Sequence, residues 1–481
     1  MIMRRQKSEQ ALWAREQFGK VVVGDERRML RLVGMAARAA ERPSGKISEV
    51  FSEDKERQGA YDLLESGRVD VSALTDAMGS AAARLARGLP FSYVAIDGAS
   101  VTLTDRGRVK DFGAVGRAGD GGRGLKVVNA LGMDGRGVPV GVFGQVWWTR
   151  KRVAGRVGSK KARRRLKQRW NRLRPSSEKE TRYWMEAIDA ASSRAREANA
   201  RLWFLLDREA DNHALLTKLA ESNHQFTVRG SWDRVIEDSE GGTHRLLQWL
   251  DEKSPRYAYE INVPAAPNRR ARLARVSVRW GKVVLRMHGK HGKDLLEVSA
   301  IWAREHGTCL ANEQPLDWLL LTSADVRTPN DAREVIFGYT LRWRIESFHK
   351  TWKSGACNVE KTQLRSSGAV MVWATMLAAV AARIERLKLL SRSEPEKPAS
   401  IELDAYEIRA LILLKRDIKK RTETIPDATP TIAQATLWIS QLGGYTGKSS
   451  GGPPGSITIR RGLDYLRPAA HLLRRLDGHE E

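Results

Sequence analysis

The feature that most constrains the fold is a succession of three apolar, β-rich runs in the first third of the chain. These runs are residues 91–97 (FSYVAID), 125–131 and 138–148, and glycine-rich turns separate them. Short apolar runs with turn residues between them predict neighbouring antiparallel strands. We therefore expect a three-stranded meander at the start of a larger unit.

Helical and strand-like segments alternate after this meander. Their expected positions are a helix at about 178–199, a buried strand at 202–207 (LWFLLD), a helix near 212–222, strand-like runs from about 225 to 304, an apolar strand at 318–323 and an amphipathic helix at about 330–354. Residues 10–85 and the remainder of the chain to about residue 476 have mainly helical periodicity. The predicted fold class is therefore α/β: a core at 86–390 with a β-rich insertion at about 225–312, flanked by helical regions at 1–85 and 391–481.

The charge of the chain is strongly unbalanced. Its 481 residues include 83 lysines and arginines against 57 aspartates and glutamates, which gives a formal net charge of +26. So large a positive excess attracts polyanions, and nucleic acid is the favoured partner because neutralised phosphates release counterions. A membrane surface is the alternative.

Other features of the sequence disfavour a membrane or secreted protein. No uninterrupted apolar run approaches the ~20 residues that a membrane-spanning helix needs. Residues 1–19 are polar and lack the apolar core of a signal peptide. The two cysteines, Cys309 and Cys357, make neither a disulfide framework nor a zinc site. We expect a cytoplasmic protein associated with the bacterial nucleoid.

Two basic segments are candidates for contacts with DNA. Arg27, Arg28 and Arg31 lie among apolar residues at helical spacing in the N-terminal region. Residues 150–174 are dense in lysine and arginine, a composition typical of a disordered or DNA-ordered loop. Both segments also have a plainer interpretation, a solvated helix face for the first and a solubilising loop for the second.

Three acidic residues occupy positions where carboxylates can reach the rim of a sheet. Asp97 is predicted to end the first strand, Asp207 ends the strand at 202–207, and Glu346 lies in the middle of a helix. Taken singly, a strand-end aspartate is more often a turn or a helix cap. In the order strand-Asp, strand-Asp, helix-Glu, the three match the ribonuclease-H-like arrangement of a two-metal site.

Phosphodiester cleavage gives a physical reason for gathering carboxylates in this way. Cleavage needs an activated water and a stabilised leaving oxygen, and two Mg²⁺ ions about 4 Å apart can supply both. Mg²⁺ is a hard ion that prefers oxygen ligands and keeps several waters, so a few carboxylates suffice. We expect two Mg²⁺ ions per site, with Mn²⁺ able to substitute.

The helix around Glu346 carries a more specific spacing. Tyr339, Arg342, Glu346 and Lys353 form the pattern Tyr-x2-Arg-x3-Glu-x6-Lys. At roughly 100° per residue these four fall within a stripe about 60° wide. An apolar set is predicted on the other side: Phe337, Leu341, Ile345, Phe348 and Trp352. A carboxylate between cations and a phenol suits a metal ligand with phosphate-binding neighbours. The alternative is a solvated face with salt bridges between helical neighbours.

These motifs together resemble a known family. The pattern of Tyr339, Arg342, Glu346 and Lys353 resembles the Y-R-E-K signature of DDE transposases from bacterial insertion sequences, in the family of the transposon-five transposase. Other similar segments are 207–211 (DREAD) with His213, 24–33 and 58–61 in the N-terminal region, 318–323 (WLLLTS), and 442–445 (LGGY). The resemblance spans residues from about 10 to about 465.

The resemblance implies a fold and an activity. The fold is a ribonuclease-H-like core interrupted by a β-rich insertion, with a DNA-end-binding region before it and a dimerisation region after it. The activity is cut-and-paste transposition: nicking at transposon ends, a hairpin intermediate, resolution of the hairpin and strand transfer. The active assembly is a homodimer that holds two ends of double-stranded DNA, each cut in trans.

The resemblance also implies roles for individual residues. Asp97, Asp207 and Glu346 are the implied catalytic residues and metal ligands. Residues implied in DNA contacts are Tyr339, Arg342 and Lys353 near the cut, Arg229, the base-stacking Trp318, Arg208 and His213 of the DREAD segment, and Arg27, Arg28 and Arg31 at the transposon end.

The chain departs from the family pattern in places. Glu41 and Asp62 stand where basic DNA contacts are expected, so the recognised end sequence should differ. The basic segment 150–174 is longer than its counterpart, and the loop at 447–455 also differs.

Two other functions fit parts of the sequence. The first is a catalytically idle DNA-binding repressor or inhibitor derived from a transposase, and the presence of all three carboxylates argues against it. The second is a nuclease without strand transfer. The N-terminal basic region and the Gly-Gly-Tyr segment argue against a nuclease, which needs neither.

Overall fold

The computed structural model describes residues 9–107, 109–116, 121–150, 179–263, 265, 270–289, 292–306, 313–419, 421–447 and 452–478. The basic segment expected to contact DNA lies outside these ranges except for Arg150. Part of the loop at 447–455 and Cys309 also lie outside them.

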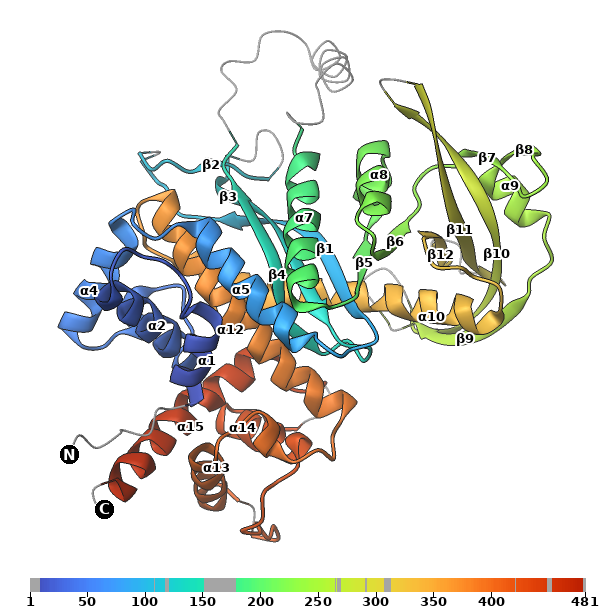
Figure 1. Cartoon of the computed structure of the whole chain (residues 1–481). Coiled ribbons are helices and arrows are strands. Elements are labelled where there is room, and N and C mark those ends of the chain that lie inside the picture. Colours follow the sequence, from blue (N-terminus) through green and yellow to red (C-terminus); the bar gives the residue numbers. More distant parts are fainter. Residues whose placement is uncertain are drawn as a thin grey trace.

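A mixed sheet runs through the centre of the chain (Figure 1). The expected meander is present as three antiparallel strands, β1 (Ser92–Thr102), β3 (Arg123–Met133) and β4 (Pro139–Trp148), with the short β2 (Gly113–Ala114) beside β3. Two further strands run parallel to β1 in turn, β5 (Leu202–Leu206) and β6 (Gln225–Arg229). The order β4-β3-β1-β5-β6 is consistent with the expected ribonuclease-H-like core.

Helices cover both faces of this core, and the residues of β1 alternate between them. Val94 and Ile96 face the side covered by α7 (Thr181–Ala198) and α8 (His213–Glu221). Ala95, Ala99 and Val101 face the opposite side, where α11 (Arg344–Lys353) and α12 (Ser367–Ser393) pack. Because successive side chains of a strand point to opposite faces, Asp97 belongs to the α11 side.

The inserted strands lengthen the same sheet beyond β6. The next strand, β12 (Asp317–Thr322), pairs with β6, followed by a long hairpin of β11 (Gly292–His306) and β10 (Arg272–Gly289). The smaller elements of this part are β7 (Val235–Glu237), β8 (Thr243–Arg245), α9 (Leu246–Asp251) and β9 (Tyr257–Val263). Although the insertion was expected from about residue 225, β6 pairs with β5, so the added strands run from β7 to β11.

Helices make up the first and last parts of the described chain, as expected. The N-terminal helices are α1 (Glu9–Phe18), α2 (Glu26–Glu41), α3 (Ile47–Val50), α4 (Asp54–Glu65) and α5 (Val71–Leu85). After α12 come α13 (Ala405–Asp417), α14 (Ile432–Leu442) and α15 (Ser456–Asp477). By length and composition α12 could cross a membrane, but 78% of its most apolar window is buried inside the protein, which marks it as a core helix.

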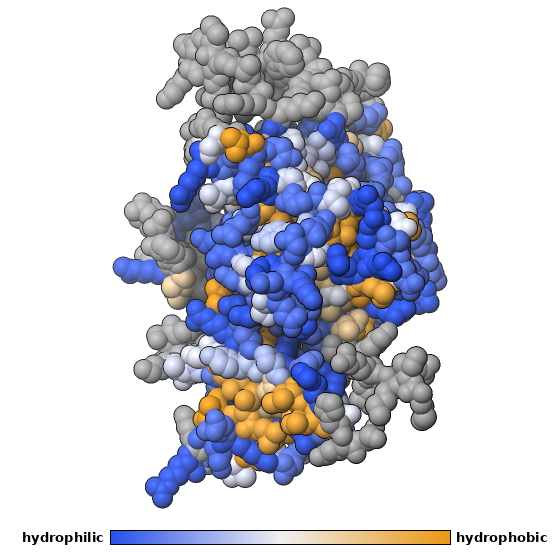
Figure 2. Space-filling model, turned by 90° about the vertical axis from the view of Figure 1, so that its left-hand side faces the viewer, coloured by the Kyte–Doolittle hydropathy of each residue, from blue (hydrophilic) through white to orange (hydrophobic). Residues whose placement is uncertain are grey.

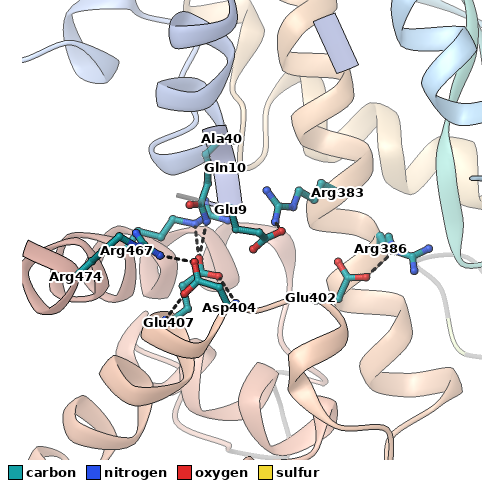
Figure 3. Close-up of polar contacts among 10 residues, drawn as sticks. All are labelled: Glu9, Gln10, Ala40, Arg383, Arg386, Glu402, Asp404, Glu407, Arg467 and Arg474. Atoms are coloured by element: carbon teal, nitrogen blue, oxygen red, sulfur yellow. Dashed lines mark hydrogen bonds and ion pairs between the residues drawn. The ribbon is translucent and has the colours of Figure 1, made fainter. Parts of the chain in front are cut away.

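A polar cluster links the N-terminal and C-terminal helices (Figure 3). Gln10 of α1 donates to Glu407 of α13 at 2.7 Å, and Glu9 is ion-paired with Arg383 of α12. Arg467 of α15 lies 3.5 Å from Glu407. Burial raises the pKa of Glu9 to about 7. These contacts fasten α1 to α12 and α13, and α15 joins the cluster through Glu407.

Candidate active site

Asp97 lies within a strand and not at its end, which corrects the prediction. The strand continues to Thr102 because Gly98–Thr102 stay paired with 124–128 of β3. On its other side, pairing with β5 stops at Ala95, opposite Leu205. Asp97 therefore stands just beyond the point where β1 and β5 separate, and its Oδ1 accepts a hydrogen bond of 2.7 Å from the Gly98 amide.

Asp207 follows directly after β5, as predicted. Its carboxylate caps the short 3-10 helix η2 (Arg208–Ala210) by accepting a hydrogen bond of 2.9 Å from the Glu209 amide. The plainer expectation of a cap is thus met as well. One carboxylate oxygen can serve the cap while the other remains for a ligand.

The single helix expected at about 330–354 is interrupted. It consists of α10 (Pro329–Thr340), a 3-10 turn η3 (Leu341–Trp343) and α11. Within the predicted apolar set, Leu341, Ile345, Phe348 and Trp352 are buried, as expected. Phe337 is 48% exposed, so its placement on the buried side was wrong. The change of helical pitch at η3 shifts the angles on which that placement depended.

Arg342 joins Asp97 to Glu346. Its Nη1 is 3.6 Å from Asp97 Oδ2, and its Nη2 is 3.6 Å from Glu346 Oε1. The side chain is buried, and within the described residues its Nε and Nη1 have no hydrogen-bond partner. A buried guanidinium with unused donors is suited to bind a phosphate oxygen.

The electrostatics of Asp97 indicate a crowded anionic site. Burial, reinforced by the nearby carboxylates of Asp207 and Glu346, raises the pKa of Asp97 to about 7, although Arg342 opposes the shift. The charges of Asp207 and Glu346 are therefore both felt at the Asp97 carboxylate. Excess negative charge of this kind is relieved when a cation binds between the carboxylates.

The donor set of the site fits a hard divalent ion. One oxygen each from Asp97 and Glu346 and one ring nitrogen of His349 lie within 4.8 Å of one another. Asp207 is not part of this group, although its charge acts on Asp97. Among the described residues a second acidic group, Glu9 with Asp404 and Glu407, is already ion-paired with arginines in the cluster of Figure 3.

Several predicted DNA-contacting residues gather beside these carboxylates. Tyr339 is 2% exposed, and its ring meets that of Trp318 edge-on with centroids 5.7 Å apart. Burial raises the pKa of Tyr339 to about 12, so its phenol stays a hydrogen-bond donor. Arg229, at the end of β6, donates to the Asp317 carbonyl at 3.0 Å. Burial and the nearby charge of Arg208 lower the pKa of Arg229.

Other predicted contacts lie elsewhere. Lys353 is in the last turn of α11, 3.5 Å from Glu360, and its charge still reaches His349 of the site. His213 pairs with Asp294 of the long hairpin at 2.5 Å. Arg27 and Arg31 are exposed on α2, and Arg28 pairs with Asp25 at 3.0 Å. In Figure 1, α2 and the long hairpin lie on opposite sides of the central sheet.

Two residues of the site were missed by sequence reasoning. Asn129 of β3 lies opposite Asp97 in the sheet register, and its Nδ2 is 3.1 Å from His349 Nε2. His349 is buried one helical turn after Glu346. His349 could have been found from the sequence, because it follows Glu346 by three residues on the same helix. The residues around Asn129 give no indication that Asn129 contacts His349.

Fold and site together define a class: an α/β protein in which two partly buried aspartates, an exposed glutamate and a buried arginine suit phosphodiester chemistry. Two families match by sequence. The transposase DNA-binding family matches residues 10–69, which contain α1 to α4, and the transposase DDE domain matches residues 169–382. Asp207 and Glu346 fall inside the second match and Asp97 lies before it. The matches support a DNA-binding transposase of the DDE class.

Proposed function

We propose that the protein is a cut-and-paste transposase, which cleaves DNA at the inverted-repeat ends of a transposon and joins the ends to a target. The observation that carries the proposal is the placement of Arg342 between Asp97 and Glu346, with the charge of Asp207 acting on the same site. Burial and electrostatic repulsion among these carboxylates raise the pKa of Asp97, and both are unfavourable for the folded protein. A repressor that only binds DNA does not need such an arrangement.

We assign metal binding and phosphate binding to different residues of the site. Asp97, Asp207 and Glu346 would hold Mg²⁺ or Mn²⁺, which supplies the activated water and stabilises the leaving oxygen. Arg342 would hold the phosphate at the cut through its unused donors, and Tyr339 would donate to it. Outside this centre, the exposed Arg27 and Arg31 on α2 would hold the transposon end and set the enzyme on it.

A homodimer on two paired ends is part of the proposal. Figure 2 shows apolar surface gathered low on the face turned to the viewer, below the N-terminal helices of Figure 1. The exposed apolar side chains of α15 include Tyr465, Leu472 and Leu476, spaced as one helix face. Exposed apolar patches on soluble proteins mark interaction sites, and this one supports self-association. Acting on chromosomal DNA, the enzyme would work in the bacterial nucleoid.

Incubation of the protein with linear DNA that carries its flanking inverted repeats, in Mg²⁺, tests the proposal. We expect DNA cut at the ends and, on addition of a second plasmid, ends covalently joined to it. Cut DNA that never joins would support the nuclease instead. End binding with neither product would support the idle repressor.

The proposed hairpin route assigns a specific step to Trp318. A hairpin bends a strand sharply, which is easier when one base leaves the stack and rests on an aromatic ring, with stacking worth ~1–3 kcal/mol. Trp318 is only partly buried and lies against Tyr339 beside the site. We expect Trp318→Ala to leave the first nick intact and to slow hairpin formation or resolution.

A stability measurement separates this role of Trp318 from simple packing. Loss of a core tryptophan typically costs ~3–5 kcal/mol, and all steps would then weaken together. The two measurements are a denaturant melt and a stepwise cleavage assay. A large loss of stability with uniformly reduced nicking would defeat the base-stacking role. Trp232→Ala is a matched control, because Trp232 is 64% exposed and lies after β6, away from the contact of Trp318 with Tyr339.

A further inference from the structure

A chain of buried polar side chains lies behind the carboxylates. It starts at Trp147 and Thr375, which both donate to Gln145 Oε1, at 3.0 and 2.6 Å. Gln145 Nε2 donates to Asn129 Oδ1 at 2.7 Å, and Asn129 Nδ2 lies 3.1 Å from His349 Nε2. Gln145, Asn129 and Thr375 are each at most 5% exposed.

The directions of these hydrogen bonds follow from Trp147, whose indole N–H is shared between Gln145 Oε1 at 3.0 Å and Thr375 Oγ1 at 3.1 Å. An indole N–H can only donate, so the atom of Gln145 that faces Trp147 is the oxygen. The Gln145 amide nitrogen therefore faces Asn129, and the Asn129 nitrogen faces His349. As a result His349 Nε2 must accept, and its lone pair is already used.

We infer that Asn129 determines the metal selectivity of the site by keeping His349 out of the coordination sphere. This inference rests on the proposed function, because it concerns the ion held by Asp97 and Glu346. Without the Asn129 amide, His349 would offer a nitrogen within 4.8 Å of oxygens from both carboxylates. An imidazole ligand favours Co²⁺, Ni²⁺ and Zn²⁺, whereas an all-oxygen set favours Mg²⁺ and Mn²⁺.

The geometry of the sheet explains why Asn129 can act in this way. Asn129 and Asp97 are directly opposite in the antiparallel pair of β1 and β3, so their side chains lie side by side on one face. The α11 helix crosses that face and brings Glu346 and His349, one turn apart, onto the same two residues. Asn129 therefore contacts the imidazole from the position next to Asp97, the carboxylate with which His349 would otherwise share an ion.

Metal binding to the full-length protein without DNA tests the inference. Mn²⁺ is added to the wild type, Asn129→Ala and the double variant Asn129→Ala/His349→Gln, and nitrogen coupling to the ion is read by pulsed electron paramagnetic resonance. We expect no nitrogen coupling in the wild type, coupling in Asn129→Ala, and none in the double variant. The ratio of Co²⁺ to Mg²⁺ affinity should rise about tenfold or more in Asn129→Ala alone.

The outcomes separate this inference from the proposed function. Nitrogen coupling in the wild type would overturn the role of Asn129 while leaving a metal site in place. Failure of the wild type to bind Mn²⁺ would overturn both. If Asn129→Ala does not fold, Asn129→Ser replaces it, since the shorter side chain also frees the imidazole. A folded variant with unchanged metal preference and no nitrogen coupling would contradict the inference.

Discussion

Replacing Asp97, Asp207 or Glu346 by alanine should each reduce DNA nicking by about a thousandfold or more and leave end binding within about twofold. Each change removes a proposed ligand of the ions that would stabilise the transition state. Loss of such a ligand lowers the cleavage rate and leaves DNA binding in the ground state almost unchanged. The arginines proposed to bind the transposon end are untouched, since they lie on α2, away from the three carboxylates. A gel-shift assay measures the affinity for the transposon end, and a cleavage assay on the same variants measures the nicking rate.

A matched substitution controls for the loss of negative charge. Glu334 is an exposed glutamate on α10, the helix that precedes the site. Glu334→Ala should nick DNA at a rate close to that of the wild type. If one of the three carboxylate variants behaved in the same way, that residue would not be a ligand.

The choice of metal ion should change the cleavage rate as strongly as the carboxylate substitutions do. We expect cleavage with Mg²⁺ or Mn²⁺, and DNA binding with little cleavage in Ca²⁺, because the longer and looser coordination of Ca²⁺ fits in-line displacement poorly. Chelation by EDTA should remove cleavage and leave end binding. Robust cleavage in EDTA would contradict a metal mechanism for all three carboxylates.

The raised pKa of Asp97 adds a pH dependence to this metal requirement. The pKa is about 7 in the folded, metal-free protein, against an ordinary value of 3.8, so the carboxyl is protonated below neutrality. Because the ion binds the carboxylate, protons compete with it, and the apparent Mg²⁺ affinity should rise with pH up to about 7 and then level off. Isothermal titration at several pH values measures this trend, which Asp97→Asn should flatten.

The elements of the core were predictable because their signals are local. The run at 202–206 is apolar throughout, and all five of its residues are buried in β5. The strands of the meander are separated by glycine-rich turns, and they pair as expected. Asp207 was correctly placed for the same reason, since the strand ends where the apolar run ends.

The errors occurred where distant residues decide the structure. Asp97 was expected at a strand end because an aspartate and a glycine interrupt the apolar run, yet pairing with β3 carries the strand on to Thr102. The turn η3 contains no proline or glycine itself, and the nearest local signal is Gly338 in the last turn of α10. The contact of Asn129 with His349 depends on sheet register and on the position of α11, neither of which the sequence states.

Mapping of the metal site by iron tests the central claim most directly, namely that Asp97 of β1, Asp207 after β5 and Glu346 of α11 hold the same ions. Fe²⁺ bound in place of Mg²⁺ generates hydroxyl radicals with ascorbate and peroxide, and these cut the polypeptide close to the ion. The structure predicts cuts in three separated segments, near Asp97, near Asp207 and near Glu346, all suppressed by excess Mg²⁺. Cuts confined to one of these segments, or found instead around the acidic group of Glu9 and Glu407, would contradict the claim.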